Sequence, residues 1–266
     1  MKRTFPTEFL YQLFALIIAV IVVHATYVAL VRPKANAVLE EQTLRMQQEE
    51  NYSPEQSVWV IIRDYEQEAC FVLMLWAFAI MGYKSVLVLR ERRLLQHELL
   101  PVREGVRILP EDTREYARTL QALPETDKRM LVPRVLLAAL ERFGSTRNVQ
   151  DVSSVSNSML DAESERLESD LSMIRYIAWA IPSIGFIGTV RGIGLALGEA
   201  HRAVQGDITG VTENLGTAFN STLIALLISI VLMFLVHQLQ SAQERLVFDA
   251  QEYVDHNLIR HMQSRS

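Results

Sequence analysis

Apolar positions gather in four long stretches that are separated by polar segments. The stretches run from Phe9 to Val31, from Ala69 to Leu89, from Ile177 to Leu197 and from Glu213 to Leu235. Each is about 20 residues long, the length with which an α-helix crosses the hydrocarbon core of a bilayer. The pattern predicts an all-α, polytopic membrane protein with four transmembrane helices.

The first stretch admits a second interpretation. A basic start precedes it, and the tripeptide at residues 23–25 resembles a signal-peptidase cleavage site, so a cleaved signal peptide is the alternative. The apolar character continues past this point to Val31. We therefore favour a retained transmembrane helix.

Basic residues at the end of the second stretch set the predicted orientation. Lys84, Arg90, Arg92 and Arg93 stand there, and positive charges beside a transmembrane helix favour the cytoplasmic side. We therefore expect a multi-pass protein of the cell inner membrane, with the N-terminus and the C-terminus both cytoplasmic. Residues 33–67 then face the periplasm of a Gram-negative cell.

The polar segments are predicted to be helical as well. In the periplasmic segment, Pro33 and Pro54 are expected to break helices, and Val58 to Ile62 to form a short amphipathic helix on the membrane surface. In the cytoplasmic part, prolines divide the chain into short helices, and Leu131 to Phe143 has clear amphipathic spacing. Helical character also continues beyond the fourth apolar stretch, to about Met262.

These observations divide the chain into six predicted segments. They are an N-terminal transmembrane helix (1–32), a periplasmic segment (33–67), a second transmembrane helix (68–90), a cytoplasmic helical domain (91–175), a core made of the third and fourth transmembrane helices (176–240), and a long C-terminal helix extending into the cytoplasm (241–266).

Composition narrows the possible functions. The chain of 266 residues is half hydrophobic and has a formal net charge of −5, which gives no reason to expect nucleic-acid binding. The single cysteine, Cys70, permits no intrachain disulfide and most simply packs in an apolar helix. The sequence has no glycine-rich phosphate loop, catalytic triad or metal-ligand spacing. We therefore expect no enzymatic activity, no cofactor and no metal.

Small residues and two threonines mark the third and fourth stretches. Helical spacing places small side chains on the same face as each threonine. The two faces consist of Thr189 with Gly185 and Gly192, and of Thr222 with Ala218 and Ala225. Since small residues let helix backbones approach closely in a membrane, the third and fourth helices are predicted to be tightly packed.

Both threonines lie at a similar predicted depth. Thr189 lies nine residues before Gly198, and Thr222 lies nine residues after Glu213, which places each roughly 13 Å from the same membrane surface. A hydroxyl on a face of small residues suits a narrow pore in which it meets a polar group of a partner. The alternative is that each hydroxyl bonds to a carbonyl of its own helix.

Two segments of the sequence resemble signatures of a known protein family. The segment PSIGFIGTVRGI, residues 182–193, resembles the P-x-x-G-x-x-G-T-V-x-G-[IM] signature of the MotA/TolQ/ExbB proton-channel family. The segment AFNSTLIAL, residues 218–226, resembles the A-L-x-T-T-x-x-G-L signature of the last membrane helix in that family. The end of the second apolar stretch looks like the ExbB/TolQ branch, to which this chain would add an N-terminal helix.

The resemblance implies a function and partners. It implies a channel-forming subunit, five copies of which surround two helices of a single-span partner of the ExbD/TolR/MotB type, with membrane lipid around them. The partner supplies an intramembrane aspartate, and Thr189 and Thr222 correspond to the hydroxyls that face it. Gly188 belongs to the signature, and Pro182 corresponds to a proline that bends or ends the third helix.

The chain departs from the family pattern at two positions. Arg191 stands where an apolar or aromatic residue is usual, and we expect it to pair with Glu199, Glu213 or a neighbouring subunit, as a packing salt bridge or as part of a gate. Thr217 stands where ExbB and TolQ typically carry a glutamate, and Glu213 lies one turn earlier. The coupling ion, H⁺ or Na⁺, therefore stays open.

Three functions are compatible with the sequence. The first is an inner-membrane motor subunit of the ExbB/TolQ type, which couples proton flow to work on the envelope or to transport. The second is a flagellar-type, MotA-like stator subunit, which the extra helix favours. The third is a passive membrane scaffold or sensor without ion flux.

Overall fold

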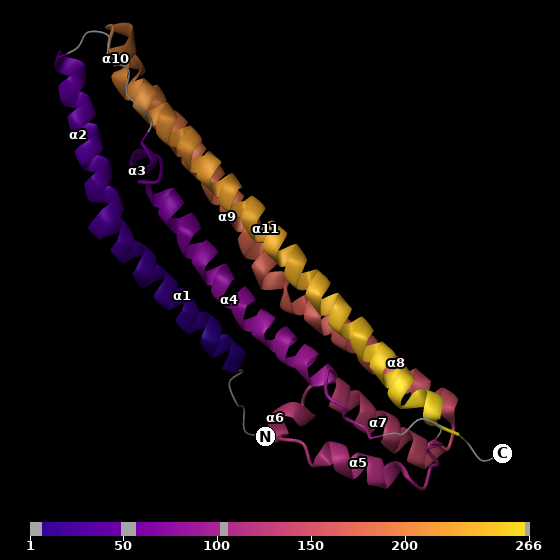
Figure 1. The fold of residues 1–266 in the computed structure, drawn as a ribbon. Helices are drawn as coiled ribbons and strands as arrows, with labels where there is room; N and C mark the ends of the chain where they lie inside the picture. Colours follow the sequence, from indigo (N-terminus) through magenta and orange to yellow (C-terminus); the bar gives the residue numbers. More distant parts are fainter. Residues whose placement is uncertain (1–6, 49–56, 102–105, 264–266) are drawn as a thin grey trace. The chain divides into compact units, whose positions relative to one another are not determined.

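The computed structural model describes residues 7–48, 57–101 and 106–263. Throughout these residues the regular structure is helical (Figure 1). Four helices within the described residues are long and apolar enough to cross a membrane. The prediction of an all-α protein with four candidate transmembrane helices and a long C-terminal helix is therefore confirmed.

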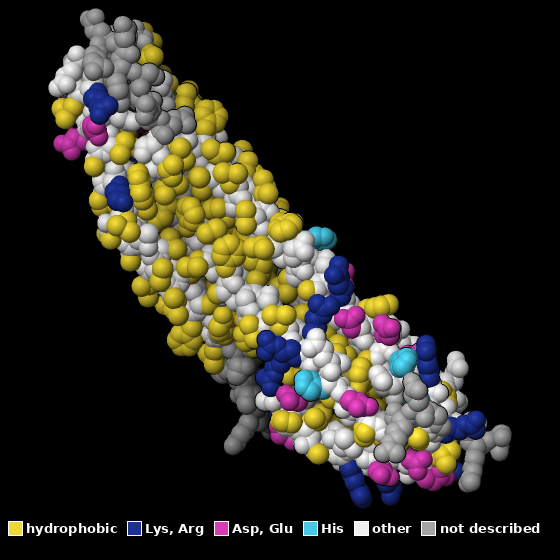
Figure 2. Space-filling model, in the orientation of Figure 1, with side chains coloured by type: hydrophobic (Ala, Val, Ile, Leu, Met, Phe, Trp, Pro, Cys, Tyr) yellow, Lys and Arg dark blue, Asp and Glu magenta, His cyan; other side chains and the backbone are white. Residues whose placement is uncertain are grey.

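The chain forms two compact units. The membrane unit consists of Met1–Gly82 and Met173–Val236, and the polar unit consists of Tyr83–Ser172 and His237–Ser266. Hydrophobic side chains cover most of the visible surface of the membrane unit, whereas charged side chains are interspersed over the polar unit (Figure 2). Large apolar side chains such as Phe186 and Phe219, each 65 % exposed, contribute to the apolar surface of the membrane unit.

The first long helix is continuous from α1 (Thr7–Thr26) through a π-helical segment (Tyr27–Val31) to α2 (Arg32–Gln48). Its buried positions repeat every four residues: Ala19, Val23, Tyr27, Val31 and Ala35. A four-residue spacing drifts by about 40° per step in an α-helix. The π segment contains i→i+5 turns, which hold more residues per turn, so it keeps these positions on one face.

The prediction that Pro33 breaks this helix is wrong. Pro33 lies in the first turn of α2, directly after the π segment, where the α-helical hydrogen-bond ladder is already interrupted. Pro54, the other predicted break, lies outside the described residues. The short helix expected at Val58–Ile62 is present as α3 (Val58–Ile61).

The second apolar stretch is α4 (Tyr65–Leu95), which packs against the first long helix. Val23, Tyr27 and Val31 form a core there with side chains of α3, the following loop and α4, namely Trp59, Ile62, Phe71, Val72 and Leu75. Two further hydrogen bonds join α1 to α4. The Tyr11 hydroxyl donates to the Ala79 carbonyl at 3.1 Å, and Trp76 Nε1 donates to the Gln12 carbonyl at 2.9 Å.

The third and fourth apolar stretches are α9 (Ser172–Gly198) and α11 (Thr209–Asn257). The connection expected at residues 199–212 contains a short helix, α10 (Ala200–Val204), and the first residues of α11. Within the membrane unit α9 and α11 are in backbone contact. A Cβ added at Gly192 would lie 2.7 Å from the Ala218 Cβ, and one added at Gly185 would lie 2.5 Å from the Ala225 Cβ.

The polar unit has its own core. It contains α5 (Thr113–Gln121), α6 (Glu125–Lys128), α7 (Leu131–Thr146), α8 (Val149–Asp170) and a 3₁₀ turn (Ile259–His261). The buried face of α7, which includes Leu136, Leu140 and Phe143, packs with Val254 and Leu258 of α11. The predicted amphipathic helix is thus confirmed. It continues to Thr146, and Arg147 ends it in a left-handed conformation with φ of 55°.

Candidate functional site

The two threonines singled out by the sequence contact each other. The Oγ1 atoms of Thr189 on α9 and Thr222 on α11 are 2.5 Å apart. Thr222 also donates to the Gly185 carbonyl of α9, and Thr189 to the Ala218 carbonyl of α11, each at 3.0 Å. The hydroxyls therefore bond mainly across the helix pair. The contact of Thr189 with a carbonyl of its own helix, at Gly185, is longer, at 3.4 Å.

The predicted faces of small residues pack on each other within one chain. Gly185 lies against Ala225 and Gly192 against Ala218, and all four are buried. Thr189 and Thr222 lie between these two contacts and are only half-buried. Each threonine thus keeps an exposed side while its hydroxyl is held by the neighbouring helix. That the exposed side faces a pore stays a prediction.

Pro182 lies inside α9 and does not end the helix. Because proline has no amide hydrogen, it cannot donate to the Ala178 carbonyl four residues earlier. The Ser229 hydroxyl of α11 donates to that carbonyl at 3.0 Å. The hydrogen bond lost at Pro182 is thus replaced from the facing helix.

Arg191 has a partner that the sequence analysis did not foresee. Its Nε and Nη2 donate to the two carboxylate oxygens of Glu66 on α4, at 2.6 and 2.8 Å. The expectation of a partner at Glu199 or Glu213 is therefore wrong. The reason is that the first turn of α4 lies against α9, so Glu66 reaches Arg191 in a two-point contact.

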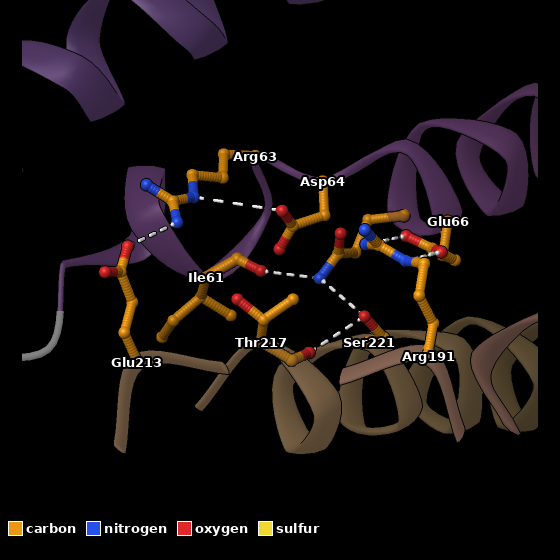
Figure 3. A network of polar contacts seen from close by, with 9 residues as sticks. Ile61, Arg63, Asp64, Glu66, Arg191, Glu213, Thr217 and Ser221 are labelled. Atoms are coloured by element: carbon orange, nitrogen blue, oxygen red, sulfur yellow. Dashed lines mark hydrogen bonds and ion pairs between the residues drawn. The ribbon is translucent and has the colours of Figure 1, made fainter. Parts of the chain in front are cut away.

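Glu213 belongs to the same polar region. Arg63, in the loop before α4, donates to Glu213 at 3.0 Å and lies 3.8 Å from Asp64 (Figure 3). We call Arg63, Asp64, Glu66, Arg191 and Glu213 the Arg63 cluster. Its three carboxylates and two guanidinium groups give it a formal charge of −1.

Asp64 is the least paired carboxylate of the Arg63 cluster. Among the described residues its one ion pair is the 3.8 Å contact with Arg63, which also pairs with Glu213. Burial raises the pKa of the Asp64 carboxyl above its ordinary value, and the charges of Glu66 and Glu213 act in the same direction. The positive charges of Arg63 and Arg191 oppose this rise without cancelling it.

Gln67 extends the polar region into the helix contact. Its side chain is fully buried, and Nε2 donates to the Ile61 carbonyl at 2.9 Å and lies 3.5 Å from Ser221 Oγ. A carbonyl oxygen can only accept a hydrogen bond, so the group that faces the Ile61 carbonyl must be the NH₂ group of Gln67. This fixes the orientation of the Gln67 side-chain amide. The Gln67 Oε1 atom then has no hydrogen-bond partner among the described residues.

Gly188 allows α4 and α11 to approach α9 closely. A Cβ at this position would lie 2.6 Å from the Ser221 Cβ and 3.2 Å from the Glu66 Cγ. Gly188 therefore lets α11 and the first turn of α4 both lie against α9. Ser221 itself donates to the Thr217 carbonyl of its own helix, at 2.9 Å.

Glu68 forms a further polar contact in the membrane unit. It accepts a hydrogen bond from Arg32, and its Oε1 lies 2.7 Å from His24 Nδ1. Glu66, Gln67 and Glu68 therefore contact three different parts of the unit: α9, α11 and the first long helix. Sequence reasoning missed this turn. Three successive polar residues at the start of an apolar stretch were the available signal.

The described residues offer no evident metal site. Within residues 7–48, 57–101 and 106–263, no group of three His, Cys, Asp or Glu side chains is arranged to hold a metal ion. The polar groups described above for the membrane unit include hydroxyls, paired charges and the buried amide of Gln67.

Comparison with known protein families finds a match for part of the chain. Residues 128–252 match the model of the MotA/TolQ/ExbB proton channel family. This region is a member of that family. The match supports a membrane subunit of the proton-channel type. No curated protein matches the chain closely enough to identify a relative.

The MotA/TolQ/ExbB region includes Thr189, Thr222, Pro182, Arg191 and Glu213. It does not include α1 to α4. The carboxylates and the amide that approach α9 and α11 from the start of α4 therefore come from outside the matched region.

Proposed function

We propose that the chain is the channel-forming subunit of an ion-driven motor of the ExbB/TolQ type in the cell inner membrane. Proton flow past the intramembrane aspartate of a single-span partner of the ExbD, TolR or MotB type would be coupled to mechanical work on the cell envelope or to transport. The carrying observation is the Thr189–Thr222 contact at 2.5 Å, which lies within the family-matched region and keeps both threonines partly exposed.

The proposed assembly is a homopentamer around a partner dimer. The outward faces of α9 and α11 support it, because they carry large exposed side chains next to the threonine contact. Phe186, Ile187, Phe219 and Ile230 are each more than 60 % exposed. Such faces need lipid, a partner helix or a second copy to cover them.

The proposed topology places both termini in the cytoplasm and retains the first helix. The contacts of α1 with α4 support retention: Tyr11 with Ala79, Trp76 with Gln12, and His24 with Glu68. Cleavage after residue 25 would remove all three. The intact mass of the membrane-extracted protein tests this directly, because a cleaved chain would lack about 25 residues.

We further propose that the protein is not an enzyme and needs no cofactor. The hydroxyls of Thr189, Thr222 and Ser229 donate to carbonyls across the α9–α11 contact, and none of these three hydrogen bonds joins a nucleophile to a base.

Ion uptake into liposomes tests the proposed function. Liposomes containing the chain and its candidate single-span partner are placed in a pH gradient, and proton uptake is followed with an enclosed pH dye. Thr222→Val keeps the shape of the side chain but removes the hydroxyl, so we expect uptake to fall at least tenfold. Thr222→Ser keeps the hydroxyl and should conduct.

Thr26→Val is the matched control for this experiment. Thr26 is exposed on α1 and donates to the Val22 carbonyl of its own helix, so its loss should not change uptake. Uptake that survives in Thr222→Val would contradict the role of the hydroxyl. No uptake in the wild type, from an assembled complex, would favour a passive scaffold.

A second candidate function is a flagellar-type, MotA-like stator subunit. The observation that favours it is the presence of four candidate spanning helices. Proton uptake would be shared by both motors. The identity of the single-span partner that co-purifies would separate them.

A further inference from the structure

The Arg63 cluster has an unbalanced charge in a partly buried place. Three carboxylates share two guanidinium groups, and one added proton makes the cluster neutral. Glu66 is held by two hydrogen bonds from Arg191, and Glu213 by one from Arg63. Among the described residues, Asp64 has only the 3.8 Å contact with Arg63. An added proton is therefore held most readily at Asp64.

A second observation points to the same place. Gln67 is fully buried one helical turn after Asp64, and its Oε1 atom accepts no hydrogen bond from any described residue. An ionised carboxylate cannot satisfy this oxygen, because both groups only accept. A protonated Asp64 carries one O–H donor, the group that the Gln67 oxygen lacks. A buried polar atom without a hydrogen-bond partner destabilises the folded protein, so a donor that reaches the Gln67 oxygen is stabilising.

We propose that Asp64 and Gln67 form a proton-binding site of the membrane unit, distinct from the Thr189–Thr222 pair. The ligand is a proton taken up from water near the Arg63 cluster, beside the C-terminal part of α9 and the N-terminal part of α11. It binds to a carboxylate oxygen of Asp64 and is stabilised by the Gln67 carbonyl oxygen. The inference rests on the proposed function, within which the site would load protons onto the pathway.

The position of the site fits such a role. Gln67 Nε2 lies 3.5 Å from Ser221 Oγ, and Ser221 directly precedes Thr222. Arg191, which binds the neighbouring Glu66, lies only about 3 Å along the α9 axis from Thr189. The start of α4 thus connects Asp64 to both helices that carry the threonine contact.

The charged and titratable groups around Asp64 come from four elements. Arg63 and Glu66 stand in its own segment, Arg191 on α9, Glu213 on α11, and Tyr27 on the π segment. The two arginines favour the ionised carboxylate, and the two glutamates favour the protonated one. Variants of Asp64 and Gln67 leave these four charges in place, so they test the site without dismantling the cluster.

The first test is infrared difference spectroscopy of the full-length protein in liposomes after a pH jump. The wild type should give a band of a protonated carboxyl group, and Asp64→Asn should lose it. Gln67→Leu removes the accepting oxygen, so the band should persist but titrate at a lower pH. A wild-type band that Asp64→Asn leaves unchanged would overturn the proposal. So would a Gln67→Leu band that titrates as in the wild type.

Proton uptake with the single-span partner supplies the second readout. Asp64→Asn should lower the uptake rate at least threefold, while Asp207→Asn, an exposed aspartate in the connection before α11, should not change it. Normal uptake in Asp64→Asn would overturn the site as a loading group. Uptake absent from the wild type would instead contradict the proposed function, whatever the carboxyl band shows.

Discussion

The Ser229 hydroxyl of α11 donates a 3.0 Å hydrogen bond to the Ala178 carbonyl of α9. Ala178 is the residue whose helical donor is missing because residue 182 is a proline. A carbonyl in a helix contact within a membrane has no water molecule that could donate a hydrogen bond to it. Ser229 therefore allows α9 to continue through Pro182.

This relationship predicts a non-additive pair of substitutions. Ser229→Ala should lower the free energy of unfolding by about 1 kcal/mol, because the Ala178 carbonyl loses its donor. In a Pro182→Ala background the new amide at position 182 can donate instead, so Ser229→Ala should then cost much less. Thermal unfolding of the four proteins in detergent gives the coupling energy.

Ser183→Ala is the control for this cycle, since Ser183 is partly exposed and bonds to the Trp179 carbonyl of its own helix. It should be nearly neutral in both backgrounds. Equal effects of Ser229→Ala with and without Pro182 would show that the hydroxyl does not replace the missing donor.

A matched pair of glycines tests the contact between α9 and α11. A Cβ at Gly192 would lie 2.8 Å from the Asn214 carbonyl oxygen and 2.9 Å from the Ala218 Cα, so backbone would have to move. A Cβ at Gly194 meets nothing within 4 Å. Gly192→Ala should therefore destabilise the protein by about 1–3 kcal/mol. Gly194→Ala should stabilise it by up to about 1 kcal/mol through helix propensity.

Melting temperatures of the two variants in the same detergent measure the difference. Equal melting temperatures would contradict the close approach of the helices. A loss of proton uptake in Gly192→Ala alone would further tie this approach to function.

The helix contact was largely predictable, because its signals lie in local spacing. Gly185, Gly192, Ala218 and Ala225 share faces with the two threonines by helical periodicity, and these faces meet in the structure. The Arg63 cluster was not predictable, because its contacts join segments more than 100 residues apart. Sequence spacing gives the depth of Arg191 but cannot give the position of Glu66 beside it.

The first helix illustrates a second limit. The prediction of a break at Pro33 applied the usual effect of proline on an α-helix. The π segment Tyr27–Val31 changes the local hydrogen-bond pattern before Pro33, and no residue type in it indicates a π turn. The buried four-residue repeat from Ala19 to Ala35 is visible only once burial is known.

The Glu66–Arg191 pair should couple α4 to α9. Glu66→Arg and Arg191→Glu each place two like charges together, so each should destabilise the protein and lower proton uptake. The combined exchange restores opposite charges and should recover part of both. Because the Arg191 side chain is 41 % exposed, the loss of stability in the neutral variant Glu66→Gln should be only on the order of 1 kcal/mol.

The exposed pair Glu41–Arg45 on α2 provides the comparison, because its side chains are 61 % and 55 % exposed. Glu41→Gln should change neither stability nor uptake measurably. An exchanged Glu66/Arg191 protein no better than the single variants would argue that the geometry of the pair, and not its charge alone, holds the helices.

The stability of the protein should depend on pH through Asp64. Its pKa is raised in the folded state, mainly by burial, so the folded protein binds this proton more tightly than the unfolded chain. The contribution to stability is therefore complete below the ordinary pKa of 3.8 and is lost as pH rises through the raised pKa. Relative to Asp64→Asn, the wild type should become less stable from about pH 4 toward neutrality.

Melting temperatures of the wild type and Asp64→Asn across this pH range measure the change. The contributions of the other carboxylates are the same in both proteins and cancel in the difference. Asp207 gives the opposite case. Hydrogen bonds from Thr209 lower the pKa of Asp207, so its small contribution should be lost as pH falls. A wild-type minus Asp64→Asn difference that is constant with pH would mean that the Asp64 carboxylate is well solvated, and a proton would then gain nothing from the Gln67 oxygen.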